Sequence, residues 1–138
     1  MYLLDTDVII DFLRKRKGPK FYFQREKFFI SAMSVLEVEY GFKRRPQSAK
    51  SQGPIFSSLL DIVKILTISD TLSETFAITK KELFDRNQII GNANLIIGSQ
   101  AIYHNLTLVT RNLKDFGRIS SLKILDFSPY LEGEAVFS

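Results

Sequence analysis

The segment "YLLDTDVIIDFLR", residues Tyr2 to Arg14, predicts a short strand, a turn and a helix in direct succession. Asp7 is a plausible N-cap of that helix. Arg14 and Lys15 suit the C-terminal end of the helix, where positive charge is favourable. Asp5 therefore stands directly after the first strand, at the place where the chain turns.

The succession of strand and helix repeats along the rest of the chain. Further strands are predicted at "KFFIS" (27–31), "VKILTI" (63–68), "LTLVT" (106–110) and "LKILDF" (122–127). Helices are predicted at 21–26, 33–44, 54–63, 69–86 and 87–105, and the segment 111–120 is predicted to be a loop. Such alternation favours an α/β fold, with a parallel sheet covered by helices on both faces.

Local signals place some of the helix starts. Pro54 fits the first turn of the helix at 54–63, after a polar loop around "RRPQS". Thr71-x-x-Glu74 resembles a capping box for the next helix. The tail from Ser128 is expected to be weakly held.

Length and composition point to one domain spanning residues 1–138 and exclude several chemistries. The 138 residues are 45% hydrophobic, which is enough to bury a core. The chain has no cysteine and one histidine, His104, which excludes disulfides and thiolate or histidine-based zinc sites and makes a Ser-His-Asp triad improbable. No signal peptide and no membrane-spanning segment is recognisable, so a cytoplasmic protein that contacts no membrane is expected.

Positive charge is concentrated in the first part of the chain. Residues 1–50 hold eleven Lys and Arg against six Asp and Glu, whereas residues 51–138 hold eight against nine. The excess lies in two clusters, one of Arg14, Lys15, Arg16 and Lys17 and the other of Lys43, Arg44 and Arg45. Such clusters attract a polyanion such as RNA, although a solvated basic face is the alternative interpretation.

Polar residues follow several of the predicted strands. In an open parallel sheet the functional site lies outside the carboxyl ends of the strands. Asp5 follows the first strand, Glu37 lies in the first turn after the second, and Asn112 and Asp115 follow the fourth. Each also has a structural explanation: Asp5 suits a turn, Ser34-x-x-Glu37 matches a capping box, and the segment from Asn112 to Asp115 suits a polar loop.

Taken together, these carboxylates point to a cation. Acidic side chains gathered at one sheet edge repel each other unless a positive charge lies between them. Without cysteine and with one histidine, the strong ligands available are oxygens, which suit Mg²⁺ or Mn²⁺. Such an ion can activate water and neutralise a phosphodiester, while the basic clusters hold the strand.

Four segments of this chain resemble the PIN-domain family, and most of all its VapC-type branch, the ribonuclease toxins of bacterial toxin–antitoxin pairs. These segments are "YLLDTDVIIDFL", "ISAMSVLEVEYGFKR", "IIGNANLIIGSQAIYHNLTLVTRNLKDFGRI" and "LKILDF". The resemblance implies a three-layer α/β/α fold that cleaves RNA with Mg²⁺ or Mn²⁺ held by four acidic residues. The first acid falls on Asp5 and the second on Glu37.

The third acid of the family is absent from this chain. The family pattern Ile-Gly-x-x-Asp-x-x-Ile-Ala-Ala corresponds here to Ile90 through Ser99, so that Asn94 occupies the Asp position. The fourth acid is variable, and either Asn112 or Asp115 takes its place, with Thr110 in a supporting position. The resemblance therefore implies a metal held by Asp5 and Asn94, and a weakened site, because an uncharged amide binds Mg²⁺ poorly.

Two origins of Asn94 stay open, namely an engineered inactive form and a naturally weakened member. Two functions also stay open: an endoribonuclease with an impaired site, and a non-catalytic PIN-like module that binds RNA or a protein. A Rossmann-like nucleotide binder is disfavoured, because no G-x-G-x-x-G follows the first strand.

The resemblance also implies partners. They are an RNA substrate, a cognate antitoxin whose C-terminal segment places an Arg over the acidic residues, and a second copy in a homodimer. Exposed apolar residues that could form the dimer contact are Phe21, Tyr22, Phe28 and Phe42.

Overall fold

The computed structural model describes residues 1–15 and 27–128. The predicted helix at 21–26 and the predicted weakly held tail after Ser128 lie outside these residues. So do Arg16, Lys17, Phe21 and Tyr22.

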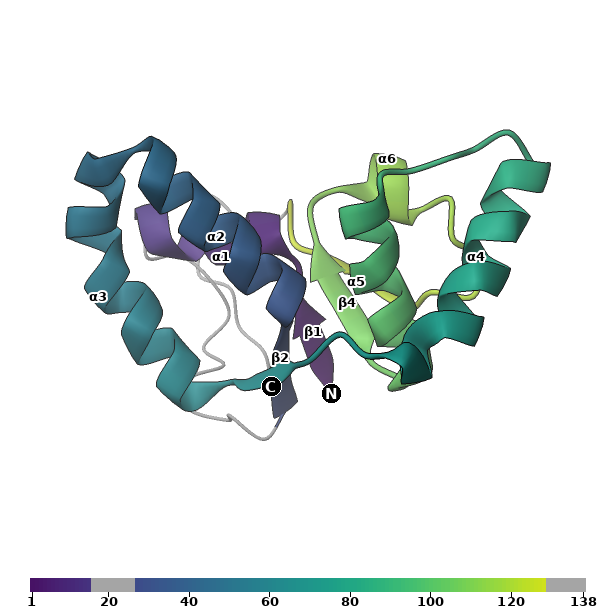
Figure 1. Cartoon of the computed structure of the whole chain (residues 1–138), viewed down its shortest axis with the longest axis horizontal. Helices are drawn as coiled ribbons and strands as arrows, with labels where there is room; N and C mark the ends of the chain where they lie inside the picture. The colour runs from purple at the N-terminus through teal and green to yellow at the C-terminus, as the bar shows by residue number, and fades with distance from the viewer. Residues whose placement is uncertain (16–26, 129–138) are drawn as a thin grey trace.

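The centre of the molecule is a parallel sheet of five strands (Figure 1). The strands are β1 (Tyr2–Leu4), β2 (Phe28–Ser31), β3 (Lys64–Leu66), β4 (Thr107–Thr110) and β5 (Ile124–Asp126). Their order across the sheet is β3-β2-β1-β4-β5, and each neighbouring pair is parallel. The first strand of the chain thus lies at the centre, with β2 on one side and β4 on the other.

Helices cover both faces of the sheet, as Figure 1 shows, and the predicted three-layer α/β/α fold is confirmed. One group consists of α1 (Thr6–Lys15), α2 (Ala32–Arg44) and α3 (Pro46–Ile62). The other consists of α4 (Ser73–Asp85), α5 (Asn92–Tyr103) and the short α6 (Leu113–Phe116), with the 3₁₀ turn η3 (Asp70–Leu72) before α4.

The sheet separates two hydrophobic clusters because neighbouring strand residues point to opposite faces. Leu4 and Val109 belong to the cluster under α1 and α3, whereas Leu3 and Leu108 belong to the cluster under α4 and α5. All four side chains are fully buried. Burial of each such side chain contributes roughly 1.5–3 kcal/mol, so the central strands hold both layers together.

Two predictions about residues between 28 and 54 are wrong. The helix predicted from Pro54 begins at Pro46 instead, and Pro54 lies inside α3. Pro46 takes the favourable position in the first helical turn. Phe28, which was a candidate for the dimer contact, is 1% exposed and belongs to the core, and Phe42 is partly buried against the same cluster.

Two local predictions in the second layer also fail. No side chain caps the start of α4, because the Thr71 hydroxyl pairs with the Ser69 hydroxyl at 2.8 Å instead. The predicted loop at 111–120 contains α6, whose N-cap is Asn112. Asn112 accepts a hydrogen bond from the Asp115 backbone N–H, which starts this short helix.

Within residues 1–15 and 27–128, no helix combines the length and the apolar character that crossing a membrane requires.

Candidate active site at the carboxyl edge of the sheet

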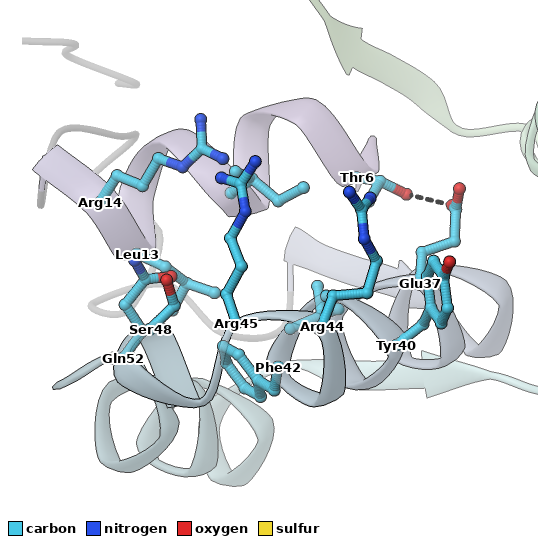
Figure 2. Close-up of a pocket in the computed structure, with 13 residues that line it drawn as sticks. Thr6, Leu13, Arg14, Glu37, Tyr40, Phe42, Arg44, Arg45, Ser48 and Gln52 are labelled. Carbon is cyan, nitrogen blue, oxygen red and sulfur yellow. Dashed lines mark hydrogen bonds between the residues drawn. The ribbon is translucent and has the colours of Figure 1, made fainter. Parts of the chain in front are cut away.

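Glu37 lies against the start of α1 rather than at a helix cap. The Thr6 hydroxyl donates a hydrogen bond to Glu37 Oε1 at 2.7 Å (Figure 2). The Ser34 hydroxyl lies 2.8 Å from the Thr6 hydroxyl oxygen. Since Thr6 gives its single hydroxyl proton to Glu37, Ser34 donates to Thr6. The capping-box interpretation of Ser34 and Glu37 is therefore wrong, and Ser31 caps α2 instead, through the Met33 backbone N–H.

Asp5 sits where β1 ends and α1 begins, and it is 3% exposed. Its backbone N–H donates to the Val109 carbonyl at 2.9 Å, which ties this position to β4. Its two carboxyl oxygens accept from the Thr6 backbone N–H and from the Thr110 hydroxyl, each at 2.8 Å. Since β1 and β4 are parallel neighbours, Asp5 and Thr110 meet at the carboxyl edge of the sheet.

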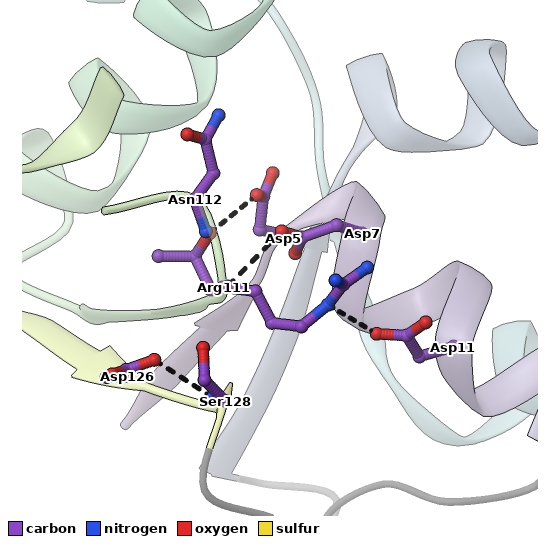
Figure 3. A network of polar contacts seen from close by, with 8 residues as sticks. Asp5, Asp7, Asp11, Arg111, Asn112, Asp126 and Ser128 are labelled. Carbon is purple, nitrogen blue, oxygen red and sulfur yellow. Dashed lines mark hydrogen bonds and ion pairs between the residues drawn. The ribbon is translucent and has the colours of Figure 1, made fainter. Parts of the chain in front are cut away.

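Asp7 lies beside Asp5, in the first turn of α1 (Figure 3). The helix begins at Thr6, so Asp7 is inside it and not its N-cap. Burial, together with the negative charge of Asp7, raises the pKa of Asp5 to about 8. Burial also raises the pKa of Asp7, against the lowering effects of Asp5 and Arg111. Both shifts favour the neutral forms of these two carboxyl groups.

The two oxygens of Asp7 differ in their surroundings. Asp7 Oδ1 is buried and accepts from no N–H group or hydroxyl of the described residues, and the Asp7 carboxyl group faces that of Asp5. Asp7 Oδ2 accepts from the Arg111 backbone N–H at 3.2 Å. A buried carboxylate oxygen without a donor is costly, and a cation beside Asp5 and Asp7 would remove that cost.

Arg111 pairs with Asp11, the second carboxylate on α1. Its Nε lies 2.6 Å from Asp11 Oδ2, and the Asp11 side chain is 7% exposed (Figure 3). The sequence analysis did not single out Asp7, Asp11 or Arg111 for this site. The signal was present, since Asp7 and Asp11 are four residues apart and lie on one helical face, toward the end of β4.

Asn94 lies in the first turn of α5, and its amide points to the segment after β4. Asn94 Nδ2 donates to Asp115 Oδ2 at 3.1 Å, and Asn112 Nδ2 approaches the same oxygen at 3.4 Å. The Asn112 backbone N–H donates to the Thr110 hydroxyl oxygen at 2.9 Å. Thr110 is thus the link between Asp5 and the group of Asn112, Asp115 and Asn94.

Hydrogen bonds, some of them from backbone N–H groups, link the residues predicted to form the acidic site. A continuous set of hydrogen bonds runs through Glu37, Thr6, Asp5, Thr110, Asn112, Asp115 and Asn94. Among the described residues, however, no three acidic or histidine side chains are close enough to hold one metal ion. The donors are oxygens, and Asp7 Oδ1 accepts from no N–H group or hydroxyl of the described residues, so their chemistry fits a hard dication. The metal-binding role stays a prediction.

The basic residues predicted to bind RNA fall into separate places. Arg14, Arg44 and Arg45 line an open cavity of about 310 Å³ between α1, α2 and the start of α3. Figure 2 shows Arg14 and Arg45 at one end of it and Arg44 nearer to Thr6 and Glu37. Lys43 is exposed and does not line this cavity. Lys15 is the last residue of α1.

Comparison with known proteins agrees with this architecture. The model of the PIN domain family matches residues 2–122. The chain therefore belongs to the PIN domain family, and the resemblance found in the sequence is confirmed.

Relatives within that family include ribonucleases named VapC. The chain is 30% identical to Ribonuclease VapC2 of Rickettsia felis, over 88% of this chain and 94% of that protein. It is also 30% identical to Ribonuclease VapC1 of Methanocaldococcus jannaschii, over 90% of this chain and 86% of that protein.

Solved structures with the same fold include toxin–antitoxin complexes. The structure of VapBC2 from Rickettsia felis, bound to a DNA fragment from their promoter, matches with a TM-score of 0.79 and 28% identity, covering 91% of this chain and 97% of that one. VapBC-1 from nontypeable Haemophilus influenzae matches with a TM-score of 0.74 and 26% identity, covering 92% and 98%.

Proposed function

We propose that this chain is a VapC-type endoribonuclease toxin that acts with Mg²⁺ or Mn²⁺, and that Asn94 weakens its metal site. The names of the relatives support the ribonuclease activity. The observation that carries the proposal is the Asn94–Asp115 contact at 3.1 Å, joined through Asn112 and Thr110 to the buried Asp5.

The chemistry of that contact explains what Asn94 does. The amide donates an N–H to the Asp115 carboxylate, so the two side chains satisfy each other without an ion. An Asp at position 94 would place two carboxylates together, and their repulsion would favour a bound cation between them. Asn94 therefore stabilises the metal-free arrangement and lowers the affinity for the ion.

In the active arrangement Asp5 and residue 94 would hold the ion, with Asp115 and Glu37 as the other acidic groups. When bound, the ion would supply Lewis-acid stabilisation of a phosphodiester and lower the pKa of a bound water. Asp5 is oriented for this role by the Thr6 N–H and the Thr110 hydroxyl. Glu37 is oriented by the Thr6 hydroxyl, so Thr6 positions two of the acidic groups at once.

The alternative is a PIN-like module that binds RNA or a protein without cleaving it. The same contact favours it, because Asn94 satisfies Asp115 with no metal present. The two functions differ in what a carboxylate at position 94 does to RNA cleavage.

The experiment compares the unchanged chain with Asn94→Asp on total RNA, with Mg²⁺, with Mn²⁺ and with EDTA. We expect Asn94→Asp to cleave RNA in the presence of either ion, at least tenfold faster than the chain with Asn94, and neither form to cleave in EDTA. Asn92→Asp is the matched control, because Asn92 is exposed in the same helical turn and accepts from Lys80.

The outcomes separate the two functions. Equal activity of the unchanged chain and the Asn94→Asp variant would remove position 94 from the metal site. No activity in either form would favour the binding module.

The partners belong to the same proposal. A cognate antitoxin would place an Arg against Asp5, Glu37 and Asp115, where charge-assisted hydrogen bonds form. Support comes from the matching structures, which are VapBC complexes. We expect co-expressed antitoxin to copurify with this chain and to lose affinity when that Arg is replaced, and we expect the chain alone to sediment as a homodimer.

A further inference from the structure

We infer that the cavity between α1 and the α2–α3 corner is a nucleotide subsite, which holds a second phosphate of the RNA strand on Arg14 and Arg45 and a base beside Tyr40. The inference rests on the proposed ribonuclease function for the identity of the strand. It goes further, because it assigns one phosphate and one base to named side chains away from the acidic residues.

The first observation is uncompensated charge. Arg14 comes from the end of α1, and Arg44 and Arg45 come from the end of α2, and all three line the same cavity. Within residues 1–15 and 27–128, none of the three guanidinium groups forms an ion pair with a carboxylate. Figure 2 shows the guanidinium groups of Arg14 and Arg45 pointing into the space between the two helices. Like charges held together in this way favour an anion between them.

The second observation is the distance from the acidic residues. Glu37 and Arg45 lie on the same helix and its cap, and the helical rise between them is about 12 Å. Figure 2 shows the Arg14 and Arg45 side chains at the end of the cavity away from Glu37. Arg14 and Arg45 therefore contact a different phosphate from the one that is cleaved.

The third observation is an exposed aromatic ring in the lining. Tyr40 is 64% exposed, and the Arg44 guanidinium lies 5.8 Å from the centre of its ring. Figure 2 shows Tyr40 beside Glu37, with Arg44 between Tyr40 and Arg45. An exposed ring next to an arginine provides a stacking surface for a base. The arginines and the exposed ring match the phosphate and the base of a nucleotide, respectively.

The test measures binding without cleavage, by fluorescence anisotropy of a labelled single-stranded oligouridylate in EDTA. We expect Arg14→Gln and Arg45→Gln each to lower the affinity about fivefold to tenfold. Each should also reduce the slope of log affinity against log salt concentration by about 0.7, the value for one phosphate contact on a single strand. Lys50→Gln is the control, since Lys50 is exposed on α3 between the lining residues Ser48 and Gln52 but does not line the cavity.

A second arm separates the base from the phosphate. Tyr40→Ala should weaken oligouridylate binding about tenfold but leave the binding of inorganic polyphosphate unchanged, because polyphosphate has no base to stack. An equal loss on both probes would overturn the assignment of a base to Tyr40.

Three other results would overturn the subsite. One is an equal loss in Lys50→Gln, which would mean that binding follows net charge alone. Another is unchanged RNA affinity in Arg14→Gln and Arg45→Gln. The last is a loss of affinity in these two variants for a hexaglutamate peptide but not for RNA, which would assign the cavity to a protein partner. Because the assay uses the Asn94 chain in EDTA, its result stands apart from the cleavage assay. If the arginine variants lose RNA affinity but Asn94→Asp does not cleave RNA, the proposed enzyme activity is refuted and the RNA-binding subsite stands.

Discussion

The two ends of α1 carry ionisable side chains of opposite kind. Asp5 and Asp7 lie at the N-terminal end, and Arg14 lies close to the C-terminal end, about 15 Å away along a helix of ten residues. Both placements agree with the helix dipole, which favours negative charge at the first end and positive charge at the second. Asp5 is buried and Asp7 is partly buried, whereas Arg14 is exposed.

Burial decides how much each ionisable end of α1 lowers the stability of the folded protein. A buried carboxylate loses its hydration and either binds a cation or takes up a proton, and the raised pKa of Asp5 shows the second outcome. An exposed guanidinium keeps its water, so an unpaired arginine costs the fold little and stays available for a ligand. The acidic end should therefore dominate stability and catalysis, and the basic end should dominate the salt dependence of binding.

The largest expected effect tests the acidic end as a metal site. In the Asn94→Asp background, Asp5→Asn should abolish the gained RNA cleavage, by about a hundredfold or more, because it removes the carboxylate expected to hold the ion. Initial rates on a fluorogenic RNA with Mn²⁺ measure this, and circular dichroism checks that the fold persists. A double variant as active as Asn94→Asp would exclude Asp5 from the site.

The next effect concerns the stability of the metal-free protein against pH. The pKa of Asp5 is raised from 3.8 to about 8, so the folded state binds this proton more tightly than the unfolded state. The stabilising contribution is complete below about pH 4 and is lost as the pH rises through about 8. We expect the free energy of unfolding to fall by a few kcal/mol across this window.

Urea unfolding in EDTA at about pH 5 and about pH 8.5 measures this change. Asp5→Asn is the control, because an amide does not titrate, and its stability should vary less with pH. If both proteins lose the same stability, the pH dependence arises from other groups.

A smaller effect on stability is expected at Asp11, whose carboxylate already pairs with Arg111. Arg111→Met should lower the free energy of unfolding by about 1–3 kcal/mol, since it leaves the buried Asp11 without its cation, while the partial exposure of Arg111 limits the loss. Lys81→Met, at the exposed Lys81–Asp85 pair, should leave the stability unchanged. Equal losses in the two variants would mean that burial of Asp11 is irrelevant.

The smallest effect belongs to the basic end. Raising the salt concentration from about 50 mM to about 200 mM should weaken RNA binding about tenfold, as expected for a few phosphate contacts on a single strand. The melting temperature should change little over the same range, because exposed charges contribute little to the fold. RNA affinity that is independent of salt would mean that the basic residues form only a solvated face.

Several parts of this site follow from the sequence because they depend on strand ends. Asp5, Thr110 and Asn112 stand directly after or at the end of apolar strands, and parallel strands bring their carboxyl ends to one edge. Asn94 required the family pattern, since nothing local distinguishes its amide from a buried polar group. The PIN domain match spans residue 94, and the role of each residue in catalysis stays a prediction.

Local motifs failed where a distant partner competed for the same side chain. Ser34 and Glu37 have the spacing of a capping box, yet both contact Thr6, which is about thirty residues away in the sequence. Thr71 likewise pairs with Ser69 instead of capping α4. A capping box describes a helix in isolation, and it cannot account for hydroxyl groups brought near by another element.

The sequence by itself determined the alternation of strands and helices, the acidic residues after the strands and the surplus of arginine and lysine in the first part of the chain. These follow from local periodicity and composition, which need no knowledge of neighbours. Only the tertiary structure decided which charges meet: Arg111 with Asp11, and Arg14 in one cavity with Arg45. The reason is that strand order β3-β2-β1-β4-β5 and helix packing set these pairs, and both are properties of the whole core.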